Sequence, residues 1–109
     1  MARTDSLQGS LPVLVLKILS RRGPLHGYAI ATHIEQMSDD VLRVEEGSLY
    51  PALYRMEENG WIKAKWATTE NNRRARVYEI TARGSKQLAS DEARWHSIAA
   101  AVTRVLKNA

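Results

Sequence analysis

The segment from residue 45 to residue 80 constrains the fold more than any other part of the chain. Its first part carries apolar residues at spacings of three and four, which predicts an amphipathic helix over roughly residues 47–59. The apolar positions of this helix are Leu49, Leu53 and Met56. Two stretches that alternate between apolar and polar residues follow, separated by the turn-forming pair Asn71-Asn72. The segment therefore predicts a helix followed by a β hairpin.

Two further helices are expected before this segment and one after it. Apolar periodicity predicts the first over residues 11–20, where Pro12 would fall in a first turn that does not need its missing N–H. The second is predicted over about residues 27–37. Thr81 is a favoured N-cap residue and opens a last helix that runs to about Leu106.

These elements predict a mainly α fold with a small β hairpin. We expect a winged helix-turn-helix unit over residues 1–81, followed by a C-terminal helix over residues 82–109. The short apolar patch at Val41, Leu42 and Val44 is a candidate third strand that would pair weakly with the hairpin.

Charge is distributed unevenly along the chain, although the net charge is only +4. Acidic residues outnumber basic ones from Glu35 to Glu58, and the balance inverts from Lys63 to Lys86. A compact basic block interleaved with aromatic residues is typical of a surface that faces phosphate. The alternative is a solvated, charged hairpin that serves solubility.

In a winged helix-turn-helix, the N-terminal part of the later helix enters the major groove of DNA. The outward residues predicted to contact DNA from this helix are Ser48, Tyr50, Pro51 and Tyr54, joined by Tyr28 at the start of the preceding helix. Ser48 could instead cap the helix, and the tyrosines could be half-buried packing residues. His26 could contact a phosphate or be an ordinary loop histidine.

The hairpin is the richest source of cations. The acidic pair Glu45-Glu46 suits the positive end of a helix dipole but repels phosphate, so affinity for any duplex must come from elsewhere. The hairpin side chains predicted to supply it are Lys63, Lys65, Arg73, Arg74 and Arg76. The acids Glu57-Glu58 are interpreted as solvated charges at a helix end.

The last helix carries an apolar seam with a seven-residue repeat. Leu88, Trp95 and Val102 repeat every seven residues, as do Ile98 and Val105, and Leu106 is a further apolar residue of this helix. Because the preceding unit is complete without this seam, a second copy of the chain is its simplest partner. Trp95 would then be an interface anchor or, with a gap between the two copies, a flat wall for a planar ligand.

Several other functions lack sequence support. The chain has no cysteine, and no stretch approaches the roughly 20 apolar residues of a membrane-spanning helix. We find no secretion signal and expect a cytoplasmic protein. No catalytic constellation, phosphate-binding glycine loop or metal-ligand spacing is visible, so we expect neither an enzyme nor a cofactor.

The chain resembles the PadR family of transcriptional regulators over about residues 7–106. The matching stretches are residues 25–28 (LHGY), 46–53 (EGSLYPAL), 58–62 (ENGWI), 73–78 (RRARVY) and 80–84 (ITARG). Where many members have glycines at the tip of the hairpin, this chain has Asn71-Asn72.

The resemblance implies a homodimeric repressor that binds a palindromic operator in double-stranded DNA. It also implies release by a small aromatic or hydrophobic effector, with Trp95 at a position where some members stack drugs. Dimerisation would involve the first helix through Leu11 and Val15, together with Leu88, Trp95, Ile98, Val102 and Leu106. The rival hypothesis is a protein-interaction module on the same fold, whose basic hairpin docks an acidic partner.

Overall fold

The computed structural model describes residues 2–68 and 70–109, with side chains described over residues 9–68 and 70–109. The elements in chain order are α1 (Ala2–Arg22), β1 (Leu25–His26), α2 (Gly27–Met37), α3 (Glu46–Glu58), β2 (Ile62–Thr68), β3 (Arg74–Ile80) and α4 (Ala82–Asn108). The predicted helix, hairpin and C-terminal helix are confirmed. The first helix begins earlier than predicted, so Pro12 lies in its interior rather than in its first turn.

The three strands form one antiparallel sheet in the order β1-β3-β2. Besides the two strands of the hairpin, the sheet contains β1, in which Leu25 pairs with Tyr78 and His26 with Val77. The prediction of a third strand at residues 41–44 was wrong. Strand β1 has only two residues, and this is too short to leave an alternating pattern in the sequence.

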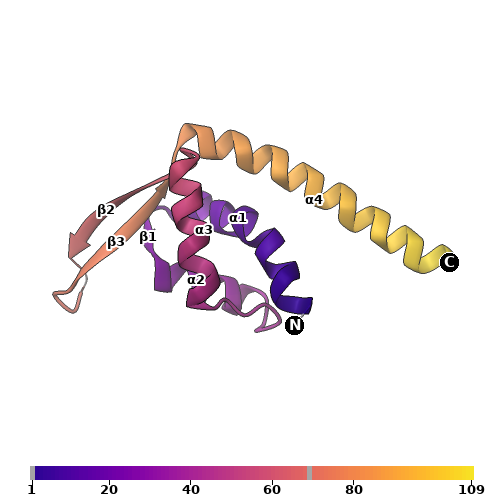
Figure 1. Cartoon of the computed structure of the whole chain (residues 1–109), viewed down its shortest axis with the longest axis horizontal. Helices are drawn as coiled ribbons and strands as arrows, with labels where there is room; N and C mark the ends of the chain where they lie inside the picture. Colours follow the sequence, from indigo (N-terminus) through magenta and orange to yellow (C-terminus); the bar gives the residue numbers. More distant parts are fainter. Residues whose placement is uncertain (1, 69) are drawn as a thin grey trace.

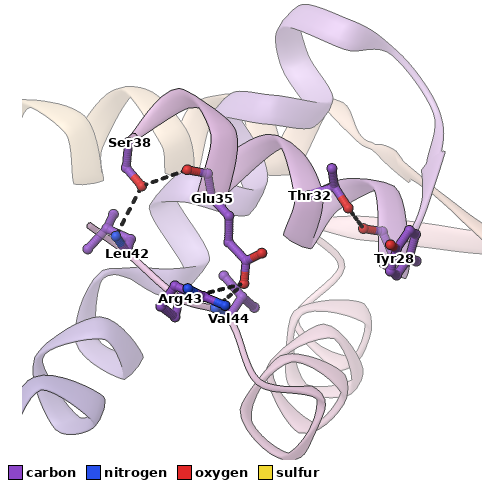
Figure 2. A network of polar contacts seen from close by, with 7 residues as sticks. All are labelled: Tyr28, Thr32, Glu35, Ser38, Leu42, Arg43 and Val44. Atoms are coloured by element: carbon purple, nitrogen blue, oxygen red, sulfur yellow. Dashed lines mark hydrogen bonds and ion pairs between the residues drawn. The ribbon is translucent and has the colours of Figure 1, made fainter. Parts of the chain in front are cut away.

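Residues 41–44 form a loop, and backbone N–H groups of this loop donate hydrogen bonds to side chains at the end of α2 and at its C-cap. The Ser38 hydroxyl accepts a hydrogen bond of 3.0 Å from the backbone N–H of Leu42. The Glu35 carboxylate accepts one of 2.9 Å from Val44 N–H and lies 3.8 Å from Arg43 Nε. Figure 2 shows these contacts joining the end of α2 to the chain that leads into α3. They fix the path by which α3 begins.

The core lies where α1 meets α2, α3, the sheet and the start of α4. The sequence assigned Leu11, Val15 and Leu88 to a dimer interface, but the structure buries all three inside the protomer. Their exposed fractions are 1%, 0% and 7%. Leu11 and Val15 face the protomer core from α1, and Leu88 faces it from α4. These side chains are therefore not available to a second chain, and the assignment is corrected.

Helix α4 leaves this core and extends away from the body, on the side opposite the hairpin (Figure 1). The Thr81 hydroxyl caps it, accepting from Gly84 N–H at 3.0 Å and donating to the carbonyl of Gly60 at 2.7 Å. Lys17 of α1 and Glu92 of α4 form an ion pair of 3.2 Å. The first turns of α4 are therefore anchored, and its later turns project into solvent.

Candidate nucleic-acid interface

The start of α3 is exposed and acidic. Glu45 occupies the N-cap position and makes no side-chain capping bond, and Glu46 lies in the first turn. Ser48 is the third helical residue, so its interpretation as the cap of this helix was wrong. Leu49, Ala52, Leu53 and Met56 face the core. The opposite face presents Tyr50, Pro51 and Tyr54 to solvent.

The start of α2 packs closely against α3. A Cβ at Gly27 would lie 2.6 Å from the Tyr50 hydroxyl oxygen, so only glycine allows this ring to cross the beginning of α2. His26 caps α2, its Nδ1 accepting from Ala29 N–H at 3.3 Å. This capping role accounts for a histidine at this position, so no ligand is needed to explain it. Its ring stacks on Tyr28, which is 73% exposed.

Aromatic side chains from α2, α3 and the hairpin surround one groove of about 490 Å³, which we call the aromatic groove. Its lining includes Tyr28, Tyr50, Tyr54, Glu57, Trp66 and Arg76. Tyr78 also lines it, and burial raises the pKa of its hydroxyl above the ordinary tyrosine value. The structure thus brings residues predicted from α3 and from the hairpin to one surface.

The pleat of the hairpin divides the predicted cations between its two faces. Trp66 lies opposite Arg76 in the strand register, and Thr68 lies opposite Arg74. These positions share the face of Ile62 and Ala64, which packs toward the core. Lys63 and Lys65 alternate with them and lie on the other face. Lysines and arginines are therefore not gathered into one patch.

Arginines stand at the hairpin tip and along the face that borders the groove. Asn72 adopts φ 61°, a left-handed conformation that asparagine tolerates, so the predicted turn chemistry is confirmed. Arg73 and Arg74 follow it and are exposed. The guanidinium carbon of Arg74 lies 5.3 Å from the centre of the Trp66 ring. This distance fits a cation–π contact that leaves the charge exposed.

Arg76 has a different environment from its neighbours at the tip. Its Nη2 lies 3.0 Å from Glu57 Oε1 of α3, and its guanidinium carbon lies 6.0 Å from the Trp66 ring centre. The interpretation of Glu57 as a solvated helix-end charge was therefore wrong. Neither Glu57 nor Trp66 was predicted as a site residue. The only sequence signal was opposite charge at the end of α3 and in the return strand.

The far half of α4 carries the apolar stripe that the seven-residue repeat predicts. Its exposed members are Trp95, Ile98, Val102, Val105 and Leu106, with exposed fractions from 47% to 78%. Residues that large are rarely exposed in a continuous row on a soluble protomer. Of the seven residues predicted for the dimer interface, the protomer buries Leu11, Val15 and Leu88. It leaves the other four exposed, and these are Trp95, Ile98, Val102 and Leu106.

The described part of the chain offers neither a metal-ion site nor a membrane-spanning helix. It contains no group of three histidine, aspartate or glutamate side chains placed to hold a metal ion. No helix of residues 2–68 and 70–109 combines the length and the apolar character needed to cross a membrane.

Helices α2 and α3 form a helix-turn-helix, and the hairpin of β2 and β3 borders the exposed face of α3. This arrangement defines the winged-helix class. Residues 15–90 match the model of the transcriptional regulator PadR-like family. This chain belongs to that family, whose members are transcriptional regulators rather than enzymes.

Solved structures agree with this assignment. A transcriptional regulator from Clostridium thermocellum superposes with a TM-score of 0.82 at 28% identity, over 92% of this chain and 96% of that one. A PadR-like regulator from Bacillus cereus gives 0.80 at 27% identity, over 96% and 99%. An uncharacterised 37.1 kDa transposon protein of Streptomyces fradiae is 40% identical, and the match covers 98% of this chain but only 27% of the relative.

Proposed function

We propose that this regulator is a homodimeric, sequence-specific DNA-binding repressor. The observation that carries the proposal is the shared surface between α3 and the hairpin. Tyr28, Tyr50 and Tyr54 line the same groove as Trp66. A duplex whose major groove receives the start of α3 would place its backbone within reach of the hairpin tip.

The two elements would have different tasks. Exposed hydroxyl, aromatic and proline side chains of α3 suit contacts with base edges, including the methyl group of thymine. Arg73 and Arg74 suit phosphate or a narrow minor groove. Lys63 and Lys65, on the other face of the hairpin, would contribute only to the general positive field.

We further propose that residues 1–81 contact DNA and that residues 82–109 pair two protomers. The exposed stripe of α4 is apolar and continuous, and its repeat suits a second helix of the same kind. A two-fold dimer would present two copies of α3, and this matches a palindromic operator. Such a protein acts where chromosomal DNA lies, and we therefore assign it to the cytoplasm.

The test is selection of bound duplexes from a random pool, using the full chain. We expect recovery of a short inverted repeat, with the spacing of its two half-sites set by the dimer. If duplexes were bound without any sequence preference, a protein-interaction module would replace the repressor as the better explanation.

Replacing Tyr54 by alanine should separate specific from general binding. Tyr54 is 62% exposed, so its removal should leave the fold intact. We expect operator affinity to fall about tenfold while affinity for a scrambled duplex changes little, because base contacts carry the sequence information. Fluorescence anisotropy titrations against both duplexes measure the ratio. Equal losses on the two duplexes would contradict a base-reading role.

A small aromatic or hydrophobic effector would bind between the two protomers, with the half-exposed Trp95 as its wall. We expect planar aromatic molecules to quench tryptophan fluorescence and to weaken operator binding. In a Trp95→Leu variant that remains dimeric, the quenching should disappear. Quenching that persists would exclude Trp95 as the wall, since Trp61 and Trp66 would then be responsible.

A further inference from the structure

We propose that Glu57, Arg76 and Trp66 form a brace that sets the angle of the hairpin relative to α3. In this proposal, which rests on the proposed DNA-binding function, Arg76 is a positioning residue and not a phosphate contact. From the sequence, Arg76 was expected to contact DNA together with Arg73 and Arg74. The geometry around it indicates a different role.

The first observation is that Arg76 joins two elements that would both face DNA. Its Nη2 lies 3.0 Å from Glu57 Oε1, and the two residues are 19 positions apart in the chain. Glu57 lies in the last turn of α3, and Arg76 lies in the third position of β3. The ion pair therefore spans the groove between the two elements.

The second observation is that Trp66 supports the guanidinium from the paired strand. Trp66 lies directly opposite Arg76 in the register, and the distance from guanidinium carbon to ring centre is 6.0 Å. The ring is 58% exposed, although a tryptophan side chain is usually well covered. The guanidinium groups of Arg74 and Arg76 both lie over this exposed ring.

The third observation is that the hairpin loses support from the core near this point. Toward the base, the same face carries the buried residues Ile62 and Tyr78. From Trp66 and Arg76 to the tip, the residues of this face are exposed. A two-stranded hairpin is marginally stable by itself, so contacts at its midpoint decide where its tip lies. The brace occupies this midpoint.

Arg76 and Arg74 differ in whether a nearby acid neutralises their charge. Glu57 already neutralises Arg76, so Arg76 would release few counterions from DNA. Arg74 lies over an uncharged ring at the exposed end of the strand and retains its charge for phosphate. The brace and simple electrostatics therefore make opposite predictions for removal of the Glu57 carboxylate. By charge alone, loss of an acid from a DNA-facing surface should strengthen DNA binding. Loss of the brace should weaken it.

The experiment compares Glu57→Ala with Glu58→Ala in the full-length protein, on the selected operator and over a range of salt concentrations. Glu58 is the adjacent, exposed acid of the same helix and provides a matched loss of charge. We expect Glu57→Ala to weaken operator binding about three- to tenfold and Glu58→Ala to leave it unchanged or tighter. If Glu57→Ala bound as tightly as the parent, the brace would be overturned.

Arg76→Ala should weaken operator binding as much as Glu57→Ala, without reducing the salt slope. The double variant should be no weaker than either single one, and the exchanged pair Glu57→Arg with Arg76→Glu should recover part of the loss. A salt slope that falls by about 1.8 per dimer in Arg76→Ala would assign Arg76 to phosphate and reject the proposal.

A measurement without DNA separates failure of the brace from failure of the proposed function. We expect backbone amides of residues 66–76 to exchange faster with solvent in Glu57→Ala than in the parent or in Glu58→Ala. Unchanged exchange would overturn the brace even if the protein bound its operator specifically. Faster exchange in a protein without any sequence preference would leave the brace standing and remove the repressor function.

Discussion

Val102→Asp should disrupt the proposed dimer and leave the protein monomeric. Val102 lies at the middle of the exposed α4 stripe and is 51% exposed, so the protomer should fold normally. In the dimer, two carboxylates would lose water at an apolar interface. We expect the dimer dissociation constant to rise at least about a hundredfold, with each tenfold step corresponding to about 1.4 kcal/mol. Sedimentation velocity over a concentration series measures this change.

The same variant should lose operator binding, because two linked half-sites bind far more tightly than one. We expect a loss of about a hundredfold or more on the palindrome. Ala100→Asp is the matched control, since Ala100 is exposed and lies on the opposite side of α4. It should remain dimeric. A Val102→Asp protein that stays dimeric would move the interface away from this stripe.

Replacing Arg73 and Arg74 together by alanine should weaken binding to every duplex. The physical reason is the loss of two phosphate contacts per protomer, or four per dimer. The slope of log affinity against log salt should then become shallower by about 3.6, and affinity near physiological salt should fall about a hundredfold. Titrations at several salt concentrations against the operator and a scrambled duplex measure both quantities.

Lys65→Ala provides the comparison for the wing arginines. It removes a cation from the same hairpin, but from the face that points away from the aromatic groove. We expect its effect on the salt slope to be well below the value of about 1.8 expected for one arginine in each protomer. If the arginine variants left the slope unchanged, the hairpin tip would not be the phosphate contact.

The elements of the fold could be predicted because each leaves a local pattern. The helical period of Leu49, Leu53 and Met56 and the alternation on both sides of Asn71-Asn72 describe α3 and the hairpin. Thr81 likewise predicted the start of α4 from its residue type alone. Signals of this kind depend on neighbours only a few positions away.

Most of the errors concern contacts between residues that are far apart in the chain. Strand β1 was missed because it exists only through pairing with Tyr78 and Val77, about 50 residues along the chain. Ser48 was considered as a cap because helix starts are uncertain by a residue or two in a sequence. Leu11 and Val15 were assigned to an interface through the family resemblance. Their apolar periodicity could not correct this, because it shows that a face is covered but not what covers it.

The sequence by itself determined the order of the four helices and the hairpin, the apolar stripe of α4 and the concentration of arginine at one turn. Only the tertiary structure decided which of those residues act together. It placed Lys63 and Lys65 on one face of the hairpin and Arg74 and Arg76 on the other, and it paired Arg76 with Glu57. The physical reason is that periodicity reports local geometry, whereas contacts across a groove depend on how separate elements pack.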